Sequence, residues 1–185
     1  LRGPRSPSEA IAIVAIDDDT LSRYPTLPAD PELHAELIRR LTDAEVAAIG
    51  LDVPELARPG LDPSGGSTAM AQPYRDLAAA IEGSGRVVMP MVWVSGSAVP
   101  DAAVPPPVAR AAVGRGSLLQ PVDLRDPRIL HPRADLCAAA AGLGVLNVHP
   151  ARDWTVRQAP LLLAAHGRLY PSLALAMAAV AAGRP

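Results

Sequence analysis

The chain has 185 residues, a formal net charge of −2 and 49% hydrophobic residues. This length suits one domain that buries roughly 70% of the surface that the unfolded chain exposes. The small net charge excludes a broad positive field for a nucleic-acid backbone, so we expect no nucleic-acid partner. All 17 basic residues are Arg, which excludes Schiff-base catalysis by Lys and the lysine of a phosphate-binding P-loop.

The aromatic content, the single cysteine and the apolar runs indicate what the core is made of and whether the chain crosses a membrane. Only 3% of residues are aromatic and none is Phe, so Ala, Val, Leu and Ile must form the core. Cys137 is the single cysteine, which excludes an intramolecular disulfide, and its apolar neighbours indicate a packed thiol. No apolar run reaches the ~18 residues of a membrane-spanning helix. Residues 1–9 are rich in Pro, Arg and Ser and are expected to form a linker in a processed or excised chain.

The first part of the domain predicts a strand, a helix and a second strand. Residues 11–16 form a short β-branched apolar run that stops at Asp17, which is typical of a buried strand. From Pro31 to residue 41, apolar residues recur at helical spacing. Residues 47–53 form a second apolar run. This order predicts a βαβ unit with a parallel strand pair and a right-handed crossover.

The rest of the chain continues the alternation, with exposed loops expected at residues 54–72 and 95–107. The other expected elements are a helix at 73–82, a strand at 86–94, a short helix at 108–113, a strand at 117–122, a helix at 133–141, a strand at 144–148, a hairpin at 156–170 and a helix at 171–182. The predicted fold class is therefore α/β. It combines a mainly parallel sheet flanked by helices with a C-terminal antiparallel hairpin and a closing helix, in one domain over residues 10–185.

Six short motifs stand in order along the chain. They are IVAIDD at 13–18, HAELIRRL at 34–41, IGLDV at 49–53, GVLN at 144–147, DWTVRQAPLL at 153–162 and LYPSLA at 169–174. This ordered set resembles the type 2 CHASE domain, the cyclase- and histidine-kinase-associated sensing extracellular family. The chain departs from the family pattern at Trp154-Thr155, where Asp-Gly is usual, at an insertion over residues 121–131, and at YPTLP over residues 24–28.

The resemblance implies a sensor module outside the cytoplasmic membrane, anchored by an N-terminal membrane helix and by C-terminal ones. It further implies control of a cyclase, a histidine or Ser/Thr kinase, or a diguanylate cyclase. The expected partners are an unknown small ligand or extracytoplasmic protein and the flanking membrane helices, with a homodimer as a further arrangement. The apolar segment at residues 173–182 fits a helix that leads to the membrane and fits a core helix equally well.

Five polar residues are the ligand-binding candidates. Asp17, Asp18, Asp52 and Asn147 follow predicted strands, and Arg157 lies on the predicted hairpin. In open parallel sheets, ligands collect outside the carboxyl ends of the strands, so these groups predict a polar pocket for a small ligand or cation. The alternative is that they cap helices and accept hydrogen bonds from loop amides.

The sequence predicts no catalytic residue, no cofactor and no metal site. It contains no Gly-x-Ser-x-Gly elbow, and its four histidines form no short metal-ligand pair. The alternative enzyme is a haloacid dehalogenase-like phosphotransferase with Asp17 as nucleophile, although Leu21 stands where that motif has Thr. A passive dimerisation module is the third alternative. The preferred interpretation is a sensor in which a ligand at the sheet rim shifts the domain between two states.

Overall fold

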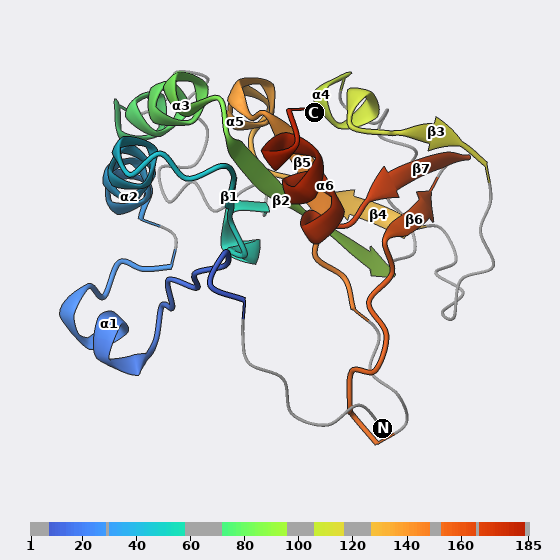
Figure 1. The fold of residues 1–185 in the computed structure, drawn as a ribbon, viewed down its shortest axis with the longest axis horizontal. Helices are drawn as coiled ribbons and strands as arrows, with labels where there is room; N and C mark the ends of the chain where they lie inside the picture. Colours follow the sequence, from blue (N-terminus) through green and yellow to red (C-terminus); the bar gives the residue numbers. More distant parts are fainter. Residues whose placement is uncertain are drawn as a thin grey trace.

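The computed structural model describes residues 8–28, 30–57, 72–95, 106–116, 127–148, 153–165 and 167–183 (Figure 1). The helices are α1 (Asp18–Arg23), α2 (Pro31–Asp43), the 3-10 helix η1 (Pro54–Ala57), α3 (Gln72–Ser84), α4 (Pro106–Arg110), α5 (Ala134–Ala139) and α6 (Leu173–Ala181). The strands are β1 (Ile49–Gly50), β2 (Val87–Ser95), β3 (Gly114–Arg115), β4 (Pro127–Leu130), β5 (Gly142–Val145), β6 (Leu162–Ala165) and β7 (Arg168–Pro171).

Strand β2 is the centre of the larger sheet. It pairs in parallel with β1 and with β5, and its last four residues pair antiparallel with β4. The second sheet is antiparallel, with the order β3-β7-β6, and its β6–β7 hairpin was predicted. A parallel bridge between Val145 and Ser172 connects the end of β5 to the residue before α6. The α/β class with a parallel ladder, a C-terminal hairpin and a closing helix is therefore confirmed.

One face of the larger sheet carries the core. The register pairs Ile49 with Val87 and Met89 with Leu143, and all four side chains are buried. They belong to one cluster with residues of α2, α3 and α5, which include Ile38, Leu77 and Leu136. Apolar runs on neighbouring parallel strands produce this arrangement because every second side chain points to the same face.

The opposite face has glycines where α6 crosses it. The register places Gly50, Gly142 and Gly144 on this face. A Cβ atom at Gly144 would overlap the Cα atom of Leu173 and lie 2.8 Å from its backbone nitrogen. Helix α6 therefore packs directly against the backbone of β5, and Figure 1 shows it lying across the sheet.

Helix α6 is apolar on every side, yet much of it is accessible. Its sequence is LALAMAAVA, but only Ala176 is buried. Ala174, Ala178 and Ala181 are exposed. A helix that is apolar all round is usually covered on all sides, so part of this surface lacks a partner among the residues that the structure describes. Within the described ranges, no helix is long and apolar enough to cross a membrane.

The first predicted strand is wrong. Residues 11–16 have no strand pairing, and Ile11, Ile13 and Val14 are 72%, 88% and 59% exposed. Only Ile16 packs against the core. β-Branched residues favour extended backbone, but a strand forms only where a neighbouring strand supplies hydrogen-bond partners. The parallel pair of the βαβ unit is instead β1 and β2, which α3 connects.

Other boundaries differ more modestly. Strand β1 is shorter than the predicted strand at 47–53, and α1 and β4 were not predicted. The segment containing β4 was interpreted as an insertion. Within the loop predicted at 54–72, residues 54–57 form η1 and residues 58–71 lie outside the described residues. The predicted strand at 117–122, most of the loop at 95–107 and residues 1–7 of the linker also lie outside them.

Candidate functional site

Asp17 and Asp18 belong to the start of α1. The Oδ1 atom of Asp17 accepts hydrogen bonds from the backbone N–H of Thr20 at 2.9 Å and from its hydroxyl at 2.7 Å. The hydroxyl hydrogen bond is the main cause of the lowered pKa of Asp17. Asp18 occupies the first turn, where a negative charge is favourable near the helix N-terminus. The structure thus gives both carboxylates a local role in starting α1.

Asp52 and Asn147 lie at the carboxyl rim of the sheet, by which we mean the edge reached after β1 and β5. Both strands run parallel to β2 on opposite sides of it, so their ends are two strand spacings apart sideways, about 9–10 Å, and β5 also ends three residues farther along β2 than β1 does. Asp52 is exposed, and no described residue forms a hydrogen bond or ion pair with it. Of the five candidates, these two are the ones that the fold places at one edge, as predicted.

The Asn147 side chain binds the backbone of β2. Its Nδ2 atom donates to the Trp93 carbonyl at 2.8 Å, and its Oδ1 atom accepts from the Trp93 N–H at 2.7 Å. On the same edge of β2, the backbone N–H of Ala141 donates to the Val87 carbonyl and that of Leu146 donates to the Met91 carbonyl. Alternate residues of β2 direct their backbone groups to the same side, so the backbone groups of Trp93 also lie on this edge. The amide of Asn147 therefore acts as one more peptide group of β5.

Arg157 forms an ion pair away from the rim. Its Nη2 atom lies 2.6 Å from Oδ2 of Asp153, and its Nη1 atom donates to Oδ1 at 2.8 Å. The Arg157 guanidinium is the main reason that the pKa of Asp153 falls to about 2. In Figure 1 the segment before β6 and helix α1 extend from different sides of the molecule. Among the described residues, Arg157 is bound to Asp153 and Asp17 to Thr20, and no hydrogen bond or ion pair joins Arg157 to Asp17 or Asp18.

Two buried aromatic residues, Trp93 on β2 and Tyr170 on β7, were not among the predicted site residues. Trp93 and Tyr170 are 2% and 0% exposed, and their rings meet edge to face with centroids 5.9 Å apart. The indole Nε1 and the Tyr170 hydroxyl are buried without a hydrogen-bond partner among the described residues. Burial raises the pKa of Tyr170. The signal available in the sequence was that Trp and Tyr supply a polar group wherever they enter an otherwise aliphatic core.

A cavity of about 540 Å³ lies beside α6, between that helix, β5, α4 and α5. We call it the α6 cavity. The cavity is partly open, and polar atoms form about as much of its surface as apolar atoms do. The described residues that line it are Pro107, Arg110, Ala111, Ala112, Val113, Cys137, Ala138, Ala140, Ala141, Gly142, Leu143, Pro171, Leu175, Ala176, Ala179 and Val180. Arg110 is the one charged residue among the described residues of this lining.

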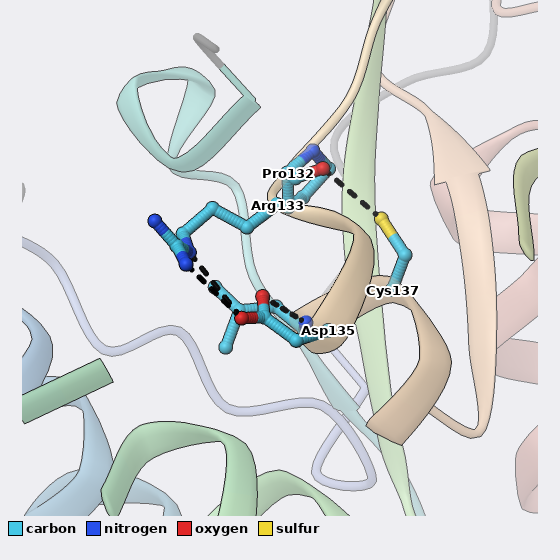
Figure 2. Close-up of polar contacts among 5 residues, drawn as sticks. Pro132, Arg133, Asp135 and Cys137 are labelled. Carbon is cyan, nitrogen blue, oxygen red and sulfur yellow. Dashed lines mark hydrogen bonds and ion pairs between the residues drawn. The ribbon is translucent and has the colours of Figure 1, made fainter. Parts of the chain in front are cut away.

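The thiol of Cys137 on this wall is inert. Figure 2 shows that it donates to the Pro132 carbonyl, with Sγ 3.3 Å from the oxygen. Burial raises its pKa to about 12, so the nucleophilic thiolate is scarcely populated at neutral pH. In the same turn, Arg133 pairs with Asp135 at 3.2 Å, and Asp135 accepts the backbone N–H of Leu136 at 2.8 Å. These contacts fix the start of α5 and hold the cavity wall in place.

No group of three or more His, Cys, Asp or Glu side chains suited to a metal ion occurs within the residues that the structure describes. His34 and His131 lie against backbone carbonyls, with ring nitrogens 2.6 Å from the oxygens of Pro28 and Pro132. His149 and His166 lie outside the described residues.

Comparison with known families identifies the chain. A family model described as the CHASE2 domain matches residues 1–184, essentially its full length. The chain belongs to the CHASE2 domain family. This is a family of extracellular sensing domains of signalling receptors, as the sequence motifs predicted. No curated protein and no solved structure matched the chain.

The fold of this CHASE2 domain weakens the phosphotransferase alternative. That mechanism requires a nucleophilic Asp at the end of a strand, but residues 11–16 are unpaired and Asp17 is a helix cap. The family is sensory rather than catalytic. The predicted absence of a catalytic residue agrees with the family.

Proposed function

We propose that this CHASE2 domain is the extracytoplasmic ligand-sensing part of a membrane-bound bacterial receptor, with membrane helices before and after it. Its output is a cyclase, a histidine or Ser/Thr kinase, or a diguanylate cyclase, and the domain itself performs no catalysis. The match to a sensing family over residues 1–184 carries the proposal. The apolar and partly uncovered α6 at the end of the fold supports it, because that helix is placed to pass a change onward.

The location is tested first. A reporter phosphatase that needs disulfides, and is therefore active only outside the cytoplasm, is fused after residue 185 in the natural gene with everything upstream of it retained. We expect high phosphatase activity in intact cells and no fluorescence from a matched fusion to a protein that folds only in the cytoplasm. The reverse pattern would place the domain inside the cell and contradict the proposal.

The second proposal is a ligand site at the carboxyl rim, formed by Asp52 and Asn147, the two of the five predicted residues that follow β1 and β5. Asp52 is the clearest member because it is exposed and unpaired within the described chain. We expect Asp52→Ala to change receptor output while leaving the free energy of unfolding within about 0.5 kcal/mol, as for other exposed positions.

The matched control for the rim is Asp43→Ala, which removes an exposed carboxylate at the end of α2. Receptor output is measured in membranes, and the free energy of unfolding is measured on the domain by urea denaturation. If Asp52→Ala and Asp43→Ala give the same output as the unchanged receptor, Asp52 takes no part in ligand binding. An Arg157→Ala variant then reports on the ion pair with Asp153 alone.

A passive dimerisation module is the second candidate. The observation in its favour is the exposed apolar segment that contains Ile11, Ile13 and Val14. Exposed extended residues of this kind pair readily with another chain. A dimer that forms through this segment and whose output is insensitive to rim and cavity variants would favour this candidate over a ligand sensor.

A further inference from the structure

We propose that the α6 cavity binds a small organic carboxylate with an apolar body. This inference deepens the proposed sensor function, on which its signalling consequence rests, but binding itself can be measured on the 185-residue chain. The cavity volume of about 540 Å³ lies within the range of roughly 300–1,000 Å³ that pockets for small organic molecules occupy.

The cavity exists because its walls carry short side chains. Alanines from three places face one another: Ala138 on α5, Ala111 after α4, and Ala176 and Ala179 on α6. Longer side chains would fill the space between these helices. An apolar occupant would gain dispersion contacts with these short side chains.

The lining selects against strongly polar ligands. Among the described residues it has no Ser, Thr, Asn, Gln, His, Asp or Glu side chain, so a sugar or nucleoside would find few side-chain hydrogen-bond partners there. Cys137 offers nothing more, because its thiol is neutral and already donates to Pro132. The described side chains of the lining therefore suit a ligand with an apolar body.

Arg110 provides the one charge. It is exposed at the end of α4, and no described residue forms an ion pair with its guanidinium group. A second guanidinium is close in the fold, because Arg168 donates from Nη1 to the carbonyl of the preceding residue, Ala109, at 3.1 Å. An arginine binds a carboxylate through two parallel hydrogen bonds. An arginine that has no ion pair among the described residues, beside aliphatic side chains, therefore matches an anionic head group on an apolar chain.

A ligand in this cavity would touch the elements on both sides at once. Leu175, Ala176 and Ala179 belong to α6, and the opposite wall belongs to α4 and α5. Occupancy therefore favours one spacing of α6 relative to α5. A ligand shifts a conformational equilibrium only by its difference in affinity for the two states, and a site built partly from α6 supplies such a difference.

The first test compares head groups on one chain length. Decanoate, decylammonium, decanol and decyl phosphate are titrated into the chain at pH 7.5 by isothermal calorimetry. We expect decanoate to bind saturably and decylammonium not to bind. Arg110→Gln should weaken decanoate binding about tenfold, because it removes a charge-assisted hydrogen bond. Arg39→Gln, which removes an exposed arginine on α2 outside the cavity, should leave the affinity unchanged.

The second test fills the cavity. Ala179→Leu places a larger side chain on the cavity wall, and we expect it to reduce decanoate affinity more than tenfold. Ala178→Leu makes the same change on the exposed side of α6 and should have no effect on binding. Circular dichroism checks that both variants fold, and Arg110→Gln remains an independent probe if they do not.

Several results would overturn the proposal. Equal binding of decanoate and decylammonium would show that Arg110 selects nothing, and decyl phosphate binding more tightly than decanoate would show that the head group is not a carboxylate. If no probe binds and the chain sediments as a dimer that Ala178→Leu disrupts, a second copy covers α6 instead. None of these results bears on the reporter fusion, so the ligand class can fail while the extracytoplasmic location stands.

Discussion

Gly144→Ala is expected to destabilise the chain by about 3 kcal/mol, the upper part of the range for overpacking a core. The added methyl group would overlap the backbone of Leu173 at the start of α6. Backbone atoms cannot rotate away as a side-chain end can, so α6 must move off β5 or the strand must bend. Either shift also disturbs the bridge between Val145 and Ser172.

Two other glycines serve as controls. At Gly50 a methyl group would also be too close to α6, but its nearest neighbours are the terminal atoms of Met177, with Cε at 2.9 Å. Because that side chain is flexible, Gly50→Ala should cost less, about 1 kcal/mol. At Gly83 nothing lies within 4 Å, and Ala favours the helix by roughly 0.5–1 kcal/mol, so Gly83→Ala should be neutral or stabilising.

The free energy of unfolding from urea denaturation, monitored by circular dichroism, checks this order. A cost below 1 kcal/mol for Gly144→Ala would show that α6 does not rest on the backbone of β5. If Gly144→Ala and Gly50→Ala lower the free energy of unfolding equally, contact with the backbone of α6 is no more destabilising than contact with the Met177 side chain. Receptor output is informative too, because a displaced α6 should alter signalling in molecules that still fold.

The sequence predicted the elements that depend on continuous apolar runs or helical spacing. The strand predicted at 86–94 is β2, and the helices predicted at 73–82 and 171–182 are α3 and α6. Strand β2 is buried on both faces from Val87 to Met91, and its sequence is apolar from Val87 to Val94, so its pattern is easy to interpret. The ordered motifs then led to the correct family although no single motif is specific.

The errors have a common physical cause. Residues 11–16 have the composition of a strand but no partner, and Asp17 after them starts a helix through Thr20 instead of ending a strand. Strand β4 was missed because it is four residues long, begins with Pro127 and gains its hydrogen bonds only from the end of β2. Pairing depends on contacts between distant parts of the chain, which local composition does not encode.

The candidate site was predictable to a similar extent. The alternation of strands and helices placed Asp52 and Asn147 at one edge, because that step needs only the direction of the strands. The order of the elements did not show that the Asn147 side chain forms hydrogen bonds with the backbone of Trp93, or that Arg157 forms an ion pair with Asp153. The α6 cavity could not be predicted either. Alanines on separate helices leave a space only at certain distances between the helices, and the sequence does not give those distances.

Asn147→Ala is expected to destabilise the chain by about 3 kcal/mol. The change leaves the N–H and the carbonyl of Trp93 without their partners, and each unsatisfied buried polar group costs roughly 1–3 kcal/mol. These groups lie where β2 has left the β5 ladder, so no neighbouring strand replaces the amide. If Asn147 acted only on a ligand, its removal would leave stability unchanged. Urea denaturation of the unliganded chain separates the two roles, and a loss below about 0.5 kcal/mol would exclude the structural one.

The isosteric variant Asn147→Asp adds a dependence on pH. An ionised carboxylate still accepts from the Trp93 N–H, but its second oxygen faces the Trp93 carbonyl, to which Asn147 donates at 2.8 Å. The protonated form can donate there, so folding favours it and raises the pKa of the new carboxyl above its unfolded value of about 3.9. Stability relative to Asn147→Ala should therefore be greatest below about pH 4 and fall as the pH rises through the raised folded-state pKa. Unfolding free energies of the two variants are measured between pH 3.5 and 7.5, and we expect the difference between them to shrink as the pH rises. If the difference stays constant, the side chain at this position does not contact the Trp93 carbonyl.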